Sequence, residues 1–143
     1  MKKLTFRVAA LLLAAFMFTA CFTACGSTKS DLVFKNSLSS TILEVYVSPT
    51  ESETWDEDNL VNLIDVKSGG VVRFDFSKFG GESGKVYDIG TIDDNNINYD
   101  GYEIVLTTGD TITLSGNSEA AVFTVTHADG TTTDYNAMVF PNS

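Results

Sequence analysis

Cysteine is scarce in this 143-residue chain, which has only Cys21 and Cys25 and none after residue 25. The later residues therefore cannot form a disulfide, and they offer no thiol nucleophile. Histidine is almost as rare, since His127 is the only one, and a zinc site needs several histidines or cysteines. The sequence also has no Gly-x-Ser-x-Gly elbow to supply a serine nucleophile. We therefore expect His127 to be a surface residue at a strand end, and the protein not to be an enzyme.

Basic side chains are also few, with 9 Lys and Arg against 19 Asp and Glu. Residues 1–24 hold three of the basic residues and no acidic one, so residues 25–143 have a net charge of −13. Nucleic-acid binding depends on Lys and Arg that neutralise phosphates. Docking onto anionic lipid needs basic patches as well. The composition excludes nucleic acid as a partner and disfavours direct docking of the domain on a membrane surface.

The N-terminal segment has the parts of a secretory signal. Lys2, Lys3 and Arg7 supply the positive start, and residues 8–18 supply an apolar centre. The alternatives are an ordinary cleaved signal and a retained membrane anchor. Residues 8–24 are shorter than the roughly 20 residues that a membrane-spanning helix needs. The pattern therefore favours a signal peptide over residues 1–24.

The tetrapeptide Phe-Thr-Ala-Cys occurs twice at the end of this segment, finishing at Cys21 and at Cys25. Each copy resembles the lipobox of bacterial lipoproteins, with Phe at the position that usually holds Leu. The resemblance implies that the cysteine sulfur carries diacylglycerol and that the signal is cut before it. We expect Cys25 to be the lipidated residue because the small Gly26 follows it, with Cys21 as the alternative. The protein is then held at the cell membrane, outside the cytoplasm, by a lipid anchor.

The rest of the chain is one domain. We expect residues 25–31 to be the lipidated cysteine and a short linker. Residues 32–143 are then a single domain, large enough for one core. Alternating apolar and polar residues, separated by Gly, Asn and Asp turns, predict about eight strands. The segments are Leu32–Phe34, Ile42–Val47, Val71–Phe76, Tyr87–Ile89, Tyr102–Leu106, Ile112–Leu114, Ala121–Val125 and Tyr135–Val139.

Short strands at this spacing are typical of an antiparallel β-sandwich, and a small closed β-barrel is the alternative. We expect Phe74, Phe76 and Phe123 to point inward, as well as Tyr102, Ile104 and Leu106. Asp129-Gly130 is a strong signal for a hairpin between the last two strands. Residues 56–63 are the one segment that could form a short helical turn.

The segment Tyr-Val-Ser-Pro at 46–49, followed by Trp55, Asp58 and Leu60, resembles a small secreted bacterial β-domain. In that family glycine follows the tryptophan, whereas this chain has Asp56. The resemblance covers about residues 36–114 and implies a β fold. The family has no assigned reaction, so the resemblance implies no activity.

Two loops rich in oxygen atoms are the candidate binding site. The first contributes Glu51, Glu53, Trp55, Asp56 and Asp58, and the second contributes Asp93, Asp94 and Asn96. Calcium takes six to eight oxygen ligands, so these loops are weak candidates for it. The second loop does not fit the EF-hand pattern, and Asp and Asn also favour turns without any ion.

Trp55, the only tryptophan, stands in the first loop. Tryptophan usually buries its ring, so we expect it to plug one end of the fold, with an exposed binding platform as the alternative. Loops concentrate function, and this one is the longest. The sequence therefore predicts a non-catalytic module that contacts a protein or cell-wall partner through this loop. A calcium-dependent surface binder is the alternative, and a small hydrolase is less favoured.

Overall fold

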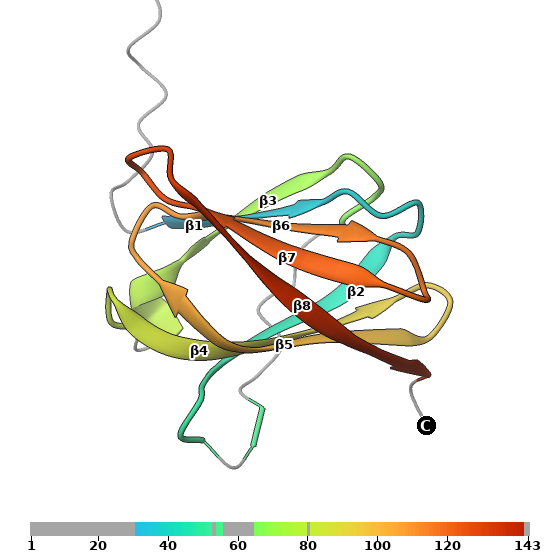
Figure 1. The fold of residues 1–143 in the computed structure, drawn as a ribbon, viewed down its shortest axis with the longest axis horizontal. Helices are drawn as coiled ribbons and strands as arrows, with labels where there is room; N and C mark the ends of the chain where they lie inside the picture. Colours follow the sequence, from blue (N-terminus) through green and yellow to red (C-terminus); the bar gives the residue numbers. More distant parts are fainter. Residues whose placement is uncertain (1–30, 53, 56–64, 80, 142–143) are drawn as a thin grey trace, which may run out of the picture.

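The computed structural model describes residues 31–52, 54–55, 65–79 and 81–141. These residues form eight β-strands and one 3-10 turn, η1 (Phe76–Phe79) (Figure 1). The strands are β1 (Asp31–Asn36), β2 (Ile42–Pro49), β3 (Val71–Asp75), β4 (Lys85–Asp93), β5 (Ile97–Leu106), β6 (Thr111–Gly116), β7 (Ala121–Thr126) and β8 (Thr132–Pro141). None of the described segments forms a helix long and apolar enough to cross a membrane. The predicted signal and linker, and the predicted helical turn at 56–63, lie outside the described residues.

The strands make one curled sheet in the order β2-β4-β5-β8-β7-β6-β1-β3. The all-β prediction is confirmed, but the sheet is a half-barrel, which fits the barrel alternative better than a two-sheet sandwich. The prediction of a purely antiparallel sheet is wrong, because β1 pairs with β6 in parallel over residues 33–36 and 111–114. β2 and β3 are the two edge strands, so the barrel is open between them.

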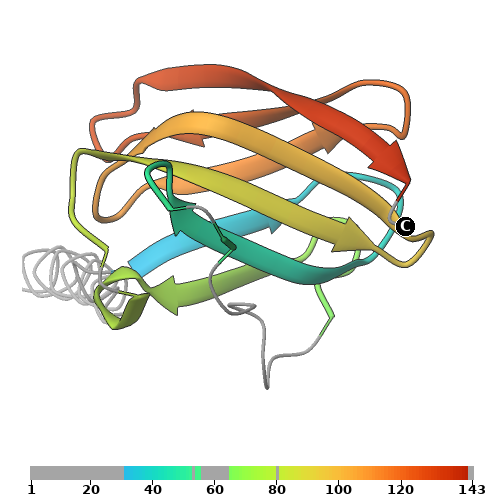
Figure 2. The same cartoon turned by 90° about the horizontal axis from the view of Figure 1, so that it is seen from below.

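Strand β8 joins the two halves of this sheet. Its residues 132–137 pair with β7, and its residues 138–141 pair with the start of β5. Figure 1 shows it running diagonally across the molecule, and Figure 2 shows the strands curling around a common interior. The β7–β8 hairpin turns at Asp129-Gly130, as the sequence predicts.

The core lies inside the curl and is filled by alternate residues of the strands. Phe123 and Ile104 are both 0% exposed, and Phe74 and Phe76 are also buried, as predicted. The inward assignment of Tyr102 is wrong, because its side chain is 43% exposed. The physical cause is an extra residue in β5, which reverses the alternation at that point and is described with the site.

Candidate functional site

An aromatic cluster lies on the outer face of the sheet, where β2, β4 and β5 run side by side. The registers place Tyr46, Gly90 and Asp100 in one row across these three strands. A Cβ atom on Gly90 would lie 3.4 Å from Trp55 Cη2 and Cζ2, so the indole lies directly over this glycine. Its ring centroid is 6.5 Å from that of Tyr46 and 6.4 Å from that of Tyr102. Three aromatic rings from three separate segments therefore meet on one surface.

The return of the loop after β2 brings Trp55 to this surface. The Thr54 carbonyl accepts hydrogen bonds from Ser48 Oγ at 3.0 Å and from Ser52 Oγ at 2.8 Å. These bonds hold the chain against the end of β2, one residue before the tryptophan. The expectation that Trp55 plugs an end of the fold is wrong, because 41% of the side chain is exposed.

A β-bulge turns Tyr102 outward toward Trp55. Tyr87 pairs with Ile104 and Ile89 pairs with Gly101, so Tyr102 and Glu103 together lie opposite the single residue Asp88. Glu103 adopts a left-handed backbone conformation, with φ of 55°, which is costly for a residue with a side chain. Its backbone N–H donates to Asp88 Oδ1 at 2.9 Å, which fixes the bulge. Bulges commonly re-aim a side chain next to a functional site.

Two carboxylates, Asp88 and Asp100, lie among these rings. Asp88 Oδ1 also accepts a hydrogen bond from Thr50 Oγ1 at 2.8 Å, and Asp100 Oδ2 accepts one from the Tyr102 hydroxyl at 3.2 Å. Asp100 is only 8% exposed. Burial raises the pKa of Asp100, and the negative charge of Asp88 raises it further, against the opposing effect of the Tyr102 hydrogen bond. The site thus holds two like charges close enough to influence each other.

A pocket of about 190 Å³ opens between Trp55 and Tyr102, with Asp88 in its wall. Hydroxyl-bearing residues complete the lining, namely Ser48, Ser52 and Thr54. A second hollow of about 650 Å³ adjoins the same loop and is lined by Glu51, Glu82 and Glu103, with Lys85 as its basic residue. Lys85 Nζ forms an exposed ion pair with Glu82 at 3.6 Å. Acidic and aromatic side chains therefore dominate this end of the sheet.

The structure brings together only part of the predicted site. Glu51 and Trp55 both lie at the end of β2, but Glu53, Asp56 and Asp58 lie outside the described residues. Asp93, Asp94 and Asn96 belong to the β4–β5 turn, which lies at the other end of the same strands, because Asp93 pairs with Ile42 and Pro49 pairs with Tyr87. The described parts of the two oxygen-rich loops therefore do not share one site. Among the described residues there is also no cluster of three side chains suited to a metal ion.

Asp93 has a structural role within its turn. Its Oδ1 accepts the backbone N–H groups of Asn95 and Ile97, each at 2.9 Å, and its Oδ2 accepts the Tyr99 hydroxyl at 3.1 Å. Burial alone would raise the pKa of Asp93, but these hydrogen bonds, with the one from Ser40, hold it below its ordinary value. The carboxylate that was expected to face a ligand instead holds the hairpin turn.

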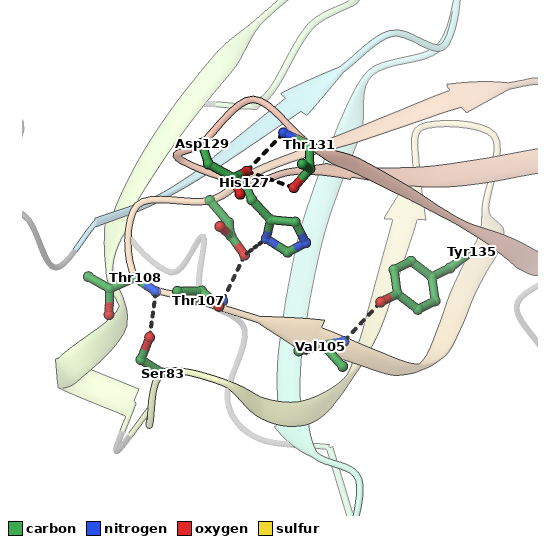
Figure 3. Close-up of polar contacts among 9 residues, drawn as sticks. Ser83, Val105, Thr107, Thr108, His127, Asp129, Thr131 and Tyr135 are labelled. Atoms are coloured by element: carbon green, nitrogen blue, oxygen red, sulfur yellow. Dashed lines mark hydrogen bonds and ion pairs between the residues drawn. The ribbon is translucent and has the colours of Figure 1, made fainter.

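His127 lies just after β7 and connects two turns (Figure 3). Its Nδ1 is 3.0 Å from Oδ2 of Asp110, a fully buried residue whose Oδ2 also accepts the Thr107 N–H at 2.7 Å. The hydroxyl of the nearby Thr131 is not bonded to the histidine, because its Oγ1 donates to Asp129 Oδ1 at 2.6 Å. A carboxylate that orients a histidine is part of a catalytic triad, but among the described residues no hydroxyl is bonded to His127 Nε2. The pair is placed to fasten the turns around residues 107–110 and 127–131.

Four residues of this site were not predicted as site residues from the sequence, namely Tyr46, Tyr102, Asp88 and Asp100. Tyr46 was noticed only as part of the Tyr-Val-Ser-Pro segment, and Tyr102 was assigned to the core. The two aspartates are ordinary outward residues of an alternating pattern, and only the strand register shows that they meet Trp55. No protein family matches this chain, and neither does any curated protein or any solved structure.

Proposed function

We propose that this chain is a lipid-anchored extracytoplasmic protein whose β-domain binds a partner in the cell envelope without catalysing a reaction. The contact surface is the aromatic face formed by Tyr46, Trp55 and Tyr102. The observation that carries the proposal is the bulge that presents Tyr102 beside the exposed Trp55. A left-handed Glu103 raises the energy of the folded state, and backbone strain of this kind is concentrated at functional sites.

The composition of the surface supports binding. Tryptophan and tyrosine are the residue types most enriched at binding hot spots, because they offer large, rigid and partly polar contact areas. Trp55 and Tyr102 are 41% and 43% exposed, although a core was available to bury them. The exposed parts of both rings are therefore available to pack against a partner.

The anchor part of the proposal rests on the two Phe-Thr-Ala-Cys segments that precede the domain. Lipidation at Cys25 leaves about six residues before the first strand, which reach at most roughly 20 Å when extended. A partner that meets the domain is then close to the membrane, as an envelope protein or a cell-wall polymer would be. The negative charge of the domain favours contact through the aromatic face over contact with anionic lipid.

The absence of catalysis is proposed because the one histidine has another role. His127 is turned toward the buried Asp110 and lies outside the two hollows beside Trp55. General acid–base chemistry at the aromatic face would therefore depend on carboxylates alone. Asp88 already accepts two hydrogen bonds there that fix the bulge and the end of β2.

The test is retention of the soluble domain, residues 28–143, on isolated envelope material. The wild-type domain should be retained, and Trp55→Ala and Tyr102→Ala should each lower retention at least tenfold, as loss of a hot-spot residue does. Val71→Ala is the matched control, because Val71 is 55% exposed but lies on the distant edge strand β3. Equal retention of all four proteins, or none by the wild type, would refute the proposed contact surface.

A further inference from the structure

We propose that the pocket between Trp55 and Tyr102 is a binding site for a primary alkylammonium group, of the kind carried by the side chain of lysine or another diamino acid. This inference rests on the proposed function and names the chemistry that the aromatic face recognises. It is carried by the size of the pocket, by its rings, by its charge and by the geometry of Asp88.

The size of the pocket suits one functional group. Pockets that take whole drug-sized ligands measure about 300–1,000 Å³, whereas this one measures about 190 Å³. The two aromatic residues that flank it are both partly exposed, Trp55 at 41% and Tyr102 at 43%. A larger partner would therefore insert a single side chain here and leave the rest of its mass outside.

The rings suit a cation. Trp55 and Tyr102 line the same pocket with their ring planes inclined by 42°, so a group between them is close to both. A cation within about 6 Å of an aromatic ring centroid is attracted by the electrons of the ring face, most strongly for tryptophan. An uncharged apolar group would gain the burial but not this attraction.

The negative charge around the pocket also favours a cationic ligand. The two hollows beside the loop are lined by four carboxylates, those of Asp88, Glu51, Glu82 and Glu103, and by one ammonium group, that of Lys85. Lys85 pairs with Glu82, which leaves the other three carboxylates without a basic partner among the lining residues. Acidic walls draw cations and repel anions. An alkylammonium group is charged at neutral pH, since its pKa is about 10.4.

Asp88 supplies an acceptor for the ammonium N–H groups. Its Oδ1 is occupied by Thr50 and Glu103, while its Oδ2 accepts no hydrogen bond from the described part of the chain. A primary ammonium group in the pocket can donate to this oxygen, and charge-assisted hydrogen bonds are about twice as strong as neutral ones. A quaternary ammonium group has no N–H to donate.

The nearby Asp100 adds a second reason for a cation. Its carboxylate is held under the rings by the Tyr102 hydroxyl, and burial and the charge of Asp88 both disfavour its ionised form. A positive charge bound beside Asp88 offsets this repulsion. Ligand binding and ionisation of Asp100 should therefore favour each other.

Trp55 reports directly on the site, because it is the only tryptophan in the chain. Titration of the soluble domain with n-butylammonium chloride at low salt should change its fluorescence saturably, with 1-butanol as the neutral probe of the same shape. We expect butylammonium to bind at least tenfold more tightly than 1-butanol, and 0.5 M NaCl to weaken the binding. Equal binding of the two probes, or equal binding of tetramethylammonium and butylammonium, would overturn the proposal.

Asp88→Asn and Asp134→Asn form a matched pair of variants. Both aspartates accept a hydrogen bond from a threonine hydroxyl, Asp88 from Thr50 and Asp134 from Thr124, but Asp134 lies on β8 away from the pocket. Asn keeps one oxygen for the bonds that fix the bulge, but it removes the charge and replaces Oδ2, the acceptor for the ammonium group, with an NH2 donor. Asp88→Asn should weaken butylammonium binding about tenfold, as loss of a charged partner does, and Asp134→Asn should change it less than twofold.

A second variant and a sugar probe keep the ammonium proposal testable if Asp88→Asn does not fold. The Trp55→Leu variant, with binding measured by calorimetry, should not bind butylammonium, and this test remains available even if Asp88→Asn fails to fold. Normal binding by Trp55→Leu would refute the role of the ring.

If methyl β-glucoside changes the fluorescence and butylammonium does not, the face binds neutral sugars, so the ammonium proposal fails while the proposed function stands. If Trp55→Ala and Tyr102→Ala do not lower retention on envelope material, the proposed function fails whatever butylammonium does.

Discussion

Gly101 and Phe123 offer a direct test of the curled sheet, because they come from strands that are not hydrogen-bonded to each other and meet only through the curl. Gly101 lies on β5 and Phe123 on β7. A Cβ atom added at Gly101 would lie 2.7 Å from Phe123 Cδ2 and 2.8 Å from Ile104 Cδ1. Carbon atoms prefer separations of about 3.5–4.0 Å. Gly101→Ala therefore forces the ring to move by about 1 Å in a closely packed core.

The expected cost of Gly101→Ala is about 1–3 kcal/mol, the usual range for overpacking. The loss of chain entropy in the unfolded state offsets this by only about 0.4–1 kcal/mol. Phe123→Leu removes Cε2, one of the two clashing ring atoms, and leaves a smaller side chain that can turn its Cδ methyl groups away from residue 101. On its own it should cost roughly 1–2 kcal/mol, less than the 3–5 kcal/mol of a full truncation to Ala. The double variant should therefore be more stable than the sum of the two costs predicts, by roughly 1 kcal/mol or more.

Urea unfolding of the wild type, the two single variants and the double variant measures this coupling. A coupling of 1 kcal/mol corresponds to about 4 °C in the melting temperature of a domain of this size, so thermal melts provide a second readout. Val71→Ala at the exposed sheet edge is the control, with an expected change within about 0.5 kcal/mol. Additive costs for Gly101→Ala and Phe123→Leu would mean that β5 and β7 do not face each other across the core.

Three further predictions concern charge, strain and the anchor. The pKa of Asp93 is lowered in the folded state, so ionised Asp93 stabilises the fold at neutral pH, and this stabilisation is lost as the pH falls through the folded-state pKa. The pKa of Asp100 is raised in the folded state, so its ionisation destabilises the fold as the pH rises. Asp93→Asn should therefore lower the melting temperature at pH 7 and Asp100→Asn should raise it, with both differences shrinking near pH 3, and shifts of the same sign at pH 7 would contradict this assignment. Glu103→Gly should stabilise the domain to urea by about 1 kcal/mol because glycine accepts the left-handed conformation freely, whereas Glu103→Ala should not. Mass spectrometry of the mature protein should find diacylglycerol on Cys25, and a lipid on Cys21 would move the predicted boundary four residues toward the N-terminus.

Local patterns allowed much of the strand layout to be predicted. The β7–β8 hairpin follows from alternating residues around Asp129-Gly130, and both the turn and the inward Phe123 are confirmed. The parallel pairing of β1 with β6 was not predictable in this way. About 75 residues separate the two strands, and no turn sequence joins them, so only the packing of the whole sheet determines that they are neighbours.

The aromatic face could not be predicted for a related reason. Tyr102 stands two residues before Ile104 and four before Leu106, a spacing that predicts an inward side chain, and the bulge at Glu103 breaks this alternation. The site also requires Tyr46, Gly90 and Asp100 to be aligned across three strands, which is a property of register and not of spacing. Trp55 was singled out from the sequence, but Tyr46 and Tyr102, whose rings lie beside it, were not.

The connectivity of β8 also determines what a chain that stopped before residue 132 would lack. The strand that pairs with both β7 and β5 is the last one in the described chain, and its pairing partners are spread over residues 97–126. Until residues 132–141 are available, the two halves of the sheet have no backbone hydrogen bonds to each other through β8, and each retains an unpaired edge. A chain that lacked residues 132–141 would therefore expose the edges of both β5 and β7, and pairing of β8 with both strands is what completes the sheet.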